Sequence, residues 1–269
     1  MYKTYFGMTG EPFPKDIPPQ ELFLSSHFKE LSTRLDYLVK KRGIGLVTGE
    51  VGSGKTTRVP SGCRALCTTL NPGLYKPLYF PNTTGSVLDL YKSLAELLGL
   101  IAPSSRAKLY IQIHQEIERM VESKKISPLL IVDEGHLLRI EALEELRLLT
   151  NYHMDSQDHL TLILVGQAEL RRKLGLNINE PLNQRIIMRY HLEGLTRKEL
   201  PLYLKHYLNR VGVTNPLFSE PAIEAIYQAS KGIPRKVNLL AQASLMACAS
   251  KKSQIVDGDH VREAVTEIS

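Results

Sequence analysis

The residues with the clearest chemical capacity are eight consecutive positions that fit the pattern G-x-x-x-x-G-K-[ST]: Gly49-Glu50-Val51-Gly52-Ser53-Gly54-Lys55-Thr56. Glycines at this spacing let the backbone turn so tightly that successive N–H groups point into one concavity and can hold phosphate oxygens. The start of the following helix adds partial positive charge there. Lys55 would reach the β- and γ-phosphates, and the Thr56 hydroxyl would ligate Mg²⁺. The loop predicts a nucleoside triphosphate site.

Two acids, Asp133 and Glu134, follow a second apolar run, residues 129–132. Asp133 would hold Mg²⁺, usually through water, and Glu134 would orient or deprotonate the attacking water. Such a pair alone could equally be a solvated acidic turn. Its distance from Lys55 along the chain suits a phosphate-binding sheet, so we interpret the two acids as part of a site that hydrolyses a nucleoside triphosphate.

Alternating strands and helices must position these groups. Apolar runs predict strands at 43–48, 77–80, 128–133, 160–165 and 186–191, and apolar residues at helical spacing predict helices between them. Buried strands that alternate with helices are typical of an α/β fold, a three-layer parallel sheet covered on both faces. Pro60 and Gly62 interrupt the helix expected after the phosphate loop, where we expect a kink or early break.

Beyond Gly194 the pattern becomes wholly helical, with four apolar stripes. We therefore expect an α/β nucleotide-binding domain over residues 1–195 and a small helical lid domain over 196–269. Residues 1–24, rich in Pro, Phe and Gly, would form an irregular lead-in to the first domain.

Composition narrows the class of protein. Among 269 residues, 43% are hydrophobic and 23% charged, which is ordinary for a soluble globular protein. No apolar run approaches the roughly 18–20 residues that span a bilayer, and no signal peptide is evident, so we expect a cytoplasmic protein without a membrane partner. The cysteines (Cys63, Cys67, Cys248) predict neither disulfides nor a zinc site. The histidines, including His136 and His153, lack metal-ligand spacing, and we expect them in turns or at the surface.

Taken together, these motifs resemble the AAA+ ATPases of the ExeA-like and transposition-helper type, a group that includes the target-selection ATPases MuB, IstB, TniB and TnsC. The resemblance covers nearly the whole chain and rests on an ordered set: residues 49–57, Asp133-Glu134-Gly135-His136, Val165-Gly166-Gln167, Asn183-Gln184-Arg185-Ile186 and Gly232-Ile233-Pro234-Arg235. It implies an AAA+ P-loop domain followed by an all-helical lid, with ATP and Mg²⁺ as cofactors and Thr57 among the nucleotide contacts. Pro60 departs from the family pattern of a continuous helix, which bears on ATP affinity or turnover.

The resemblance also implies roles for three further residues. Gln167 would be the polar sensor that helps hold the attacking water. Arg185 would be an arginine finger that reaches a neighbouring subunit's nucleotide, with Arg189 as a competing candidate; such a guanidinium is worth about 10³–10⁵ in rate. Arg235 would contact the phosphates as a second sensor and couple lid closure to ATP.

The similar ATPases form rings or helical filaments, with basic or polar loops toward the backbone of double-stranded DNA. The net charge of +6 is compatible with that use but is weak support for it. Arg106 and Lys108 are the most suitable phosphate contacts in this chain, with Lys124, Lys125 and Arg139 as rivals.

The leading hypothesis is an ATP-dependent DNA-binding protein that oligomerises on duplex DNA, selects transposition targets and activates a transposase, with or without a target-site adaptor, while hydrolysis drives disassembly. One alternative is a nucleotide-switched DNA-binding scaffold with little turnover. A helicase-type ATPase is another, although residues 134–269 read largely as a helical lid and not as a second nucleotide-binding lobe. The last is an ExeA-like secretion-associated ATPase, which we expect to need a membrane segment and a wall-binding domain.

Overall fold

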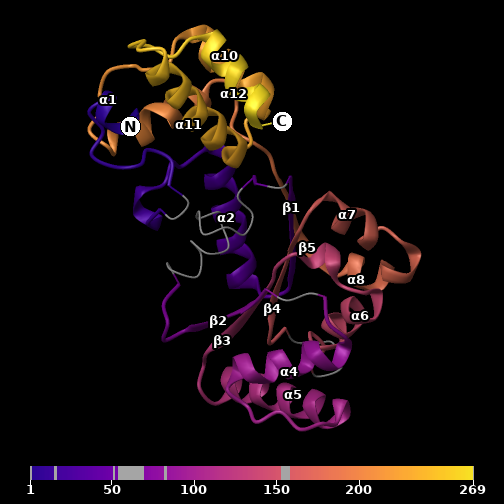
Figure 1. The fold of residues 1–269 in the computed structure, drawn as a ribbon. Coiled ribbons are helices and arrows are strands. Elements are labelled where there is room, and N and C mark those ends of the chain that lie inside the picture. Colours follow the sequence, from indigo (N-terminus) through magenta and orange to yellow (C-terminus); the bar gives the residue numbers. More distant parts are fainter. Residues whose placement is uncertain are drawn as a thin grey trace. The chain divides into compact units, whose positions relative to one another are not determined.

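A computed structural model describes residues 2–14, 17–50, 52–53, 70–81, 84–152 and 158–268, and Figure 1 shows their path. The chain divides into two compact units. The α/β unit comprises Glu30–Gly49 and Ser61–Leu192, and the helical unit comprises Met1–Lys29, Glu50–Pro60 and Glu193–Ser269.

The α/β unit is built on one sheet of five strands in the order β2-β3-β4-β1-β5. All neighbouring strands are parallel. The strands are β1 (Ile44–Gly49), β2 (Tyr75–Phe80), β3 (Ser127–Val132), β4 (Thr161–Gly166) and β5 (Ile186–Leu192). Because the strands are parallel, their carboxyl ends lie at one edge of the sheet. The residues that directly follow β1, β3 and β4 therefore lie at that edge. The predicted parallel α/β fold is confirmed.

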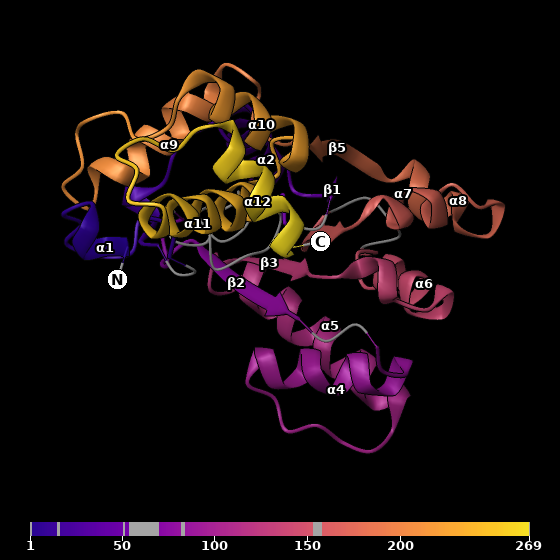
Figure 2. The ribbon, with the colours of Figure 1, turned by 45° about the horizontal axis from the view of Figure 1, so that its top comes forward.

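Helices cover both faces of this sheet. They are α2 (Ser26–Lys41), α4 (Val87–Leu98), α5 (Arg106–Glu122), α6 (Ile140–Leu148), α7 (Ala168–Leu174) and α8 (Glu180–Gln184), with short 3₁₀ turns η2 (Gly135–Leu137) and η4 (Asn177–Asn179). Leucines of α4, α5 and α6 pack with alternate strand residues in one core, while α2 packs on the other face. Figure 2 shows α4 and α5 side by side.

Local sequence explains why α4 and α2 lie where they do. The Ser86 side chain accepts from the Asp89 backbone N–H and the Asp89 carboxylate accepts from the Ser86 N–H, a capping box that starts α4. Gly99, at φ 82°, ends it in the left-handed conformation. Gly45 on β1 has no side chain, and a Cβ atom there would lie 2.3 Å from Leu38, so the glycine lets α2 pack closely on the sheet.

The helical unit contains α9 (Glu199–Asn209), α10 (Glu220–Ser230), α11 (Pro234–Ser250) and α12 (Gly258–Ile268), together with the short elements α1 (Tyr2–Tyr5) and η1 (Pro19–Glu21). Apolar side chains of α9 to α12 form one core with lead-in residues Phe13, Ile17 and Leu22. The sequence analysis assigned this lead-in to the α/β domain, but in the structure it packs on the helices. The expected domain boundary near residue 195 stays a prediction.

Polar contacts also tie the lead-in to α9. Glu21 forms an ion pair with Arg210, and its backbone oxygen lies 2.8 Å from His206 Nε2. The Phe23 backbone N–H donates to the Tyr207 hydroxyl at 3.4 Å. The lead-in is therefore ordered by the helices although it has little regular structure of its own.

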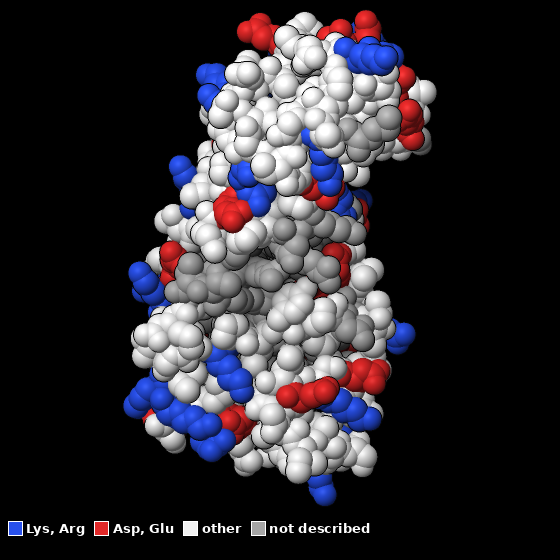
Figure 3. All heavy atoms as spheres, turned by 60° about the vertical axis from the view of Figure 1, so that its left-hand side comes forward, with Lys and Arg blue, Asp and Glu red and all other residues white. Residues whose placement is uncertain are grey.

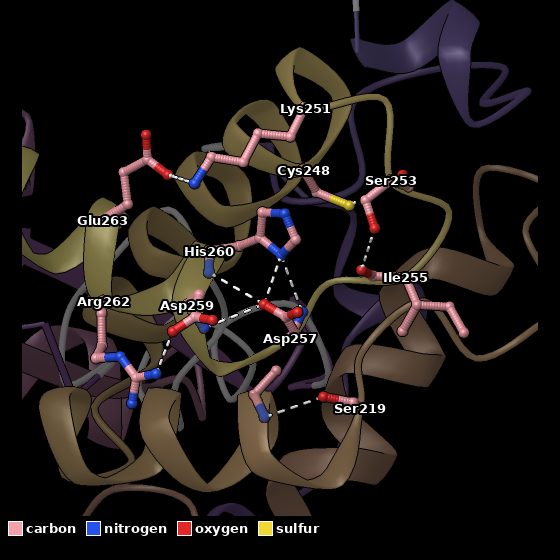
Figure 4. A network of polar contacts seen from close by, with 11 residues as sticks. Ser219, Cys248, Lys251, Ser253, Ile255, Asp257, Asp259, His260, Arg262 and Glu263 are labelled. Atoms are coloured by element: carbon pink, nitrogen blue, oxygen red, sulfur yellow. Dashed lines mark hydrogen bonds and ion pairs between the residues drawn. The ribbon is translucent and has the colours of Figure 1, made fainter.

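A carboxylate caps the start of α12, as Figure 4 shows. Asp257 Oδ1 accepts from the backbone N–H groups of Asp259 and His260 and lies 2.8 Å from His260 Nδ1. These contacts satisfy N–H groups that a helix leaves without intrahelical partners. The backbone hydrogen bond from His260 is the largest of the effects that lower the pKa of Asp257.

Candidate functional site

The structure describes part of the phosphate loop. Gly49 ends β1, Gly52 adopts φ 85°, and the buried Ser53 hydroxyl has no hydrogen-bond partner among the described residues. A buried hydroxyl of this kind fits a loop that receives phosphate oxygens. The other predicted nucleotide contacts lie outside the described residues: Val51, Gly54, Lys55, Thr56 and Thr57. The expected kink at Pro60 also lies outside them.

Within the helical unit, the start of α11 lies against Gly52. The Arg235 backbone N–H donates to the Gly52 carbonyl at 3.4 Å, and a Cβ atom at Gly52 would lie 2.7 Å from the Arg235 Cβ. Glycine is therefore needed at Gly52 both for its positive φ and for this close approach. Arg235 is exposed, as a side chain that contacts phosphate requires. Its sensor role stays a prediction.

The turn that carries Arg235 is fixed by two glycines. Gly232 has φ 71°, and a Cβ atom there would lie 2.0 Å from the Leu195 carbonyl oxygen. The Leu195 N–H donates to the Gly232 carbonyl at 2.7 Å. A Cβ atom at Gly194 would lie 2.7 Å from the Gly232 backbone. The backbone of Gly194-Leu195 thus lies directly against the turn that precedes α11.

Asp133 is held rigidly at the end of β3. The Tyr79 hydroxyl, from the neighbouring strand β2, donates to Asp133 Oδ2 at 2.7 Å, and the Glu134 backbone N–H donates to Oδ1 at 2.7 Å. The Asp133 side chain is buried. An oriented carboxylate is the oxygen ligand that Mg²⁺ prefers, and hydrogen-bonded neighbours commonly orient such ligands. The described half of the predicted Thr56–Asp133 metal pair therefore fits a Mg²⁺ ion. Sequence reasoning did not identify Tyr79.

Glu134 follows in a left-handed backbone conformation, φ 51°. This conformation costs a residue with a side chain about 1–2 kcal/mol and is found preferentially at functional sites. The Glu134 side chain is 45% exposed, whereas that of Asp133 is buried. One acid is thus enclosed and the other can reach water, and the roles of both stay predictions.

Gln167 follows β4, the strand beside β3, and contacts His136 from the turn after the acids. Gln167 Nε2 lies 3.0 Å from His136 Nε2, and His136 Nδ1 lies 3.5 Å from Glu134 Oε2. The sequence analysis expected His136 in a turn or at the surface. It lies in the turn η2, and its side chain is only 12% exposed. Nothing in its spacing indicated the contact with Gln167.

The two candidate finger arginines both make contacts within the chain. Arg185 donates to the Asn151 side chain and, at 3.3 Å, to the Arg147 carbonyl near the end of α6. Arg189 on the edge strand β5 is exposed and donates to the Asn183 carbonyl at 2.5 Å. The assignment of Arg185 as the finger stays a prediction, and so does the rival Arg189.

The candidate DNA contacts differ in availability. Arg106 forms an ion pair with the buried Glu145, which also accepts a hydrogen bond from Tyr91. Burial raises the pKa of Tyr91 to about 12, so the hydroxyl keeps the proton that it donates. Lys108 is exposed. Arg106 is thus engaged within the chain, and Lys108 is the more available of the two.

The rival basic residues also differ in their contacts within the chain. Lys124 lies 3.5 Å from Glu116, whereas Lys125 and Arg139 are exposed. Figure 3 shows Lys and Arg side chains interspersed with acidic ones on the face drawn. Within the described ranges, no group of three or more His, Cys, Asp or Glu residues could hold a metal ion. None of the described helices has the length and apolar character needed to cross a bilayer.

Comparison with known proteins identifies relatives over the whole chain. A family model described as "AAA domain" matches residues 38–174. The General secretion pathway protein A of Aeromonas hydrophila is 33% identical over 273 residues, aligned with 100% of this chain and 49% of its own length. The chain therefore spans about half the length of that curated relative.

Two solved structures share the fold. Cdc6p from Pyrobaculum aerophilum matches with a TM-score of 0.66 at 15% identity, over 99% of this chain and 71% of its own. ORC1 from Aeropyrum pernix in complex with DNA matches with a TM-score of 0.57 at 17% identity, over 95% of this chain and 67% of its own. At such identities the similarity concerns the fold alone.

Proposed function

The chain belongs to the AAA domain family and is an AAA+ ATPase that uses ATP and Mg²⁺, and on this premise we propose that it is an ExeA-like ATPase that energises a secretion assembly. The observation that carries the proposal is 33% identity to General secretion pathway protein A along the whole chain. This relative favours the ExeA-like alternative over the transposition hypothesis. The chain matches only about half of the relative, so a missing membrane segment no longer argues against that alternative.

In the proposed reaction, each described residue has one task. Asp133, oriented by Tyr79 and by the Glu134 N–H, would hold Mg²⁺ together with Thr56. The ion supplies positive charge that offsets the charge developing on the phosphates. Glu134, exposed to solvent, would orient the attacking water and accept its proton.

The remaining site residues would bind the phosphates. Lys55 and the loop N–H groups would hold the β- and γ-phosphates, and Arg235 would reach them from the start of α11. Gln167 would contact the attacking water from the end of β4. Arg185 would complete the site of the adjoining copy in a homo-oligomer, a ring or a helical filament. Hydrolysis would then depend on assembly.

A two-part experiment tests this proposal. ATP hydrolysis is first measured for the purified parent chain and for Glu134→Gln, which should retain ATP binding but lose about 10²-fold or more in turnover. The same substitution is then introduced into the producing cell, and secreted protein in the medium is compared with the parent strain. Reduced secretion with normal cell growth supports the proposal. An active parent ATPase with unchanged secretion in the variant strain contradicts the secretion role.

The second candidate is the DNA-assembled transposition helper, with double-stranded DNA, a transposase and a target-site adaptor as partners in the cytoplasm. The net charge of +6 and the exposed Lys108 favour it. Anisotropy of a labelled nonspecific duplex at low salt, with and without a non-hydrolysable ATP analogue, distinguishes the two. Nucleotide-stimulated binding that weakens in Lys108→Ala supports the helper. If it occurs without turnover, the scaffold alternative is favoured.

A further inference from the structure

The histidine after the acidic pair lies between two residues of the candidate site. One ring nitrogen of His136, Nε2, is 3.0 Å from Gln167 Nε2. The other, Nδ1, is 3.5 Å from Glu134 Oε2 and has no hydrogen-bond partner within the described residues. The ring therefore spans the space between the proposed sensor and the proposed base.

Hydrogen-bond chemistry assigns the proton on this ring. The Gln167 side-chain nitrogen can only donate, so the Nε2 atom of a neutral His136 accepts. The ring proton is then on Nδ1, which faces the Glu134 carboxylate, where negative charge favours it. The reverse orientation of the Gln167 amide would put the proton on Nε2 and leave two acceptors facing each other at Nδ1 and Glu134. In the arrangement that suits both contacts, Gln167 donates to His136 Nε2, and the proton on His136 Nδ1 faces Glu134.

The backbone around the ring is fixed by close packing. The His136 carbonyl accepts from Lys173 Nζ at 2.6 Å. A Cβ atom at Gly166 would lie 3.2 Å from the His136 backbone nitrogen, and one at Gly135 would lie 3.2 Å from the Val165 carbonyl oxygen. The turn after β3 thus packs closely on the end of β4. The His136 ring has a defined position, while the more exposed Glu134 side chain can move toward it.

We propose that His136 is a positioning residue for ATP hydrolysis: its ring links Gln167 to Glu134 and holds the Glu134 carboxylate in the orientation that water activation needs. This inference rests on the proposed function of Glu134. When Gln167 contacts the attacking water, the same amide donates to His136, so the orientation of the base depends on the state of the sensor. His136 itself does not touch the nucleotide.

Steady-state kinetics of His136 variants test the proposal. His136→Ala should lower kcat about tenfold, the value of one hydrogen bond to a charged group. The Kd for a fluorescent ATP analogue should stay within about twofold of the parent. His136→Asn places a donor amide near the position of Nδ1 and should recover most of the lost kcat, whereas His136→Gln should recover less. In a Gln167→Ala background, His136→Ala should lower kcat little further, because the hydrogen bond from Gln167 to His136 is already absent.

The half-buried His114, stacked between Tyr110 and Tyr152 in the same unit, is the matched control. His114→Ala should lower thermal stability and leave kcat unchanged. Three results would overturn the inference: parent kcat in His136→Ala, a parallel fall of kcat, ATP affinity and melting temperature, or losses that add fully with Gln167→Ala. A parent chain without ATPase activity overturns the proposed function as well, so the two failures are distinguishable.

Discussion

Replacing Gly52 with alanine tests the contact between the phosphate loop and the start of α11. The substitution introduces a Cβ atom at φ 85°, where a residue with a side chain is strained, and places it 2.7 Å from the Arg235 Cβ. Atoms of this kind do not approach so closely, so Arg235 must shift. Both effects arise within the helical unit, which makes them measurable without any assumption about the other unit.

A second glycine separates these two effects. Gly99 has nearly the same backbone angle, φ 82°, but a Cβ atom there would meet no described heavy atom within 4 Å. Gly99→Ala should therefore cost only the left-handed strain, about 1–2 kcal/mol. Gly52→Ala carries the same strain and also displaces Arg235. If the Arg235 guanidinium binds phosphate, its loss is worth roughly 1.5–3 kcal/mol, or about 10- to 100-fold in ATP affinity.

The assay is titration with a fluorescent ATP analogue. Gly52→Ala and Arg235→Ala should each weaken binding by roughly 10- to 100-fold, and the double variant should resemble either single one. Gly99→Ala should bind like the parent and melt a few degrees lower. Parent affinity in Gly52→Ala, or losses that add in the double variant, would refute the inference that Arg235 acts at this loop.

Three further outcomes follow from individual contacts. Tyr79→Phe removes the hydroxyl that orients Asp133 and should raise the Mg²⁺ concentration for half-maximal nucleotide binding about tenfold, measured by Mg²⁺ titration. Gly232→Ala drives a Cβ atom into the Leu195 carbonyl oxygen and should prevent the helical unit from folding, measured by circular dichroism and yield of soluble protein. Asp257→Asn should lower the melting temperature at neutral pH. Because the folded-state pKa of Asp257 lies below its ordinary 3.8, this stabilisation is present above pH 3.8 and is lost as the pH falls through the lower folded value, so melting curves of parent and variant should converge in acid.

Controls for the first two outcomes are available in the same units. Tyr75→Phe changes another tyrosine of β2, which is partly buried and packs against the core, and should leave the Mg²⁺ dependence unchanged. Gly212→Ala introduces a side chain at φ 85° with only an ordinary 3.7 Å contact to Thr9, and it should fold with a modest loss of stability. Equal damage from Gly212→Ala and Gly232→Ala would show that positive φ alone, and not the clash with Leu195, decides the outcome.

Sequence reasoning predicted those features that depend on local patterns. The apolar runs that form β1, β3 and β4 are buried along their whole length, as is typical of parallel strands covered on both faces. These strands could therefore be predicted from the sequence. The helix at Ala168–Leu174 lies between two of the predicted strands, where helical spacing indicated a helix. By contrast, α5 begins at Arg106, before its first buried residue Leu109, because polar residues can form a first helical turn that apolar spacing does not reveal.

The contacts that sequence reasoning missed all depend on pairing between distant segments. The hydrogen bond from Tyr79 to Asp133 requires the register in which Phe80 pairs with Val132, and no local pattern contains that register. The approach of His136 to Gln167 requires β3 and β4 to be neighbours. Phe13 and Leu22 pack with apolar residues of α9 to α12, far away in the sequence. Composition could indicate that the lead-in is ordered, but it could not show which helices the lead-in packs against.

The union of the lead-in with α9 carries a consequence for biosynthesis. Glu21 and Arg210 are 189 positions apart, and at 5–20 residues per second a ribosome needs about 10 to 40 seconds to make the intervening chain. During that interval the aromatic and aliphatic side chains of the lead-in have no helices to bury them. Transiently exposed apolar side chains of this kind are prone to aggregate, so the lead-in is a site for chaperone binding until its partner helices have been synthesised.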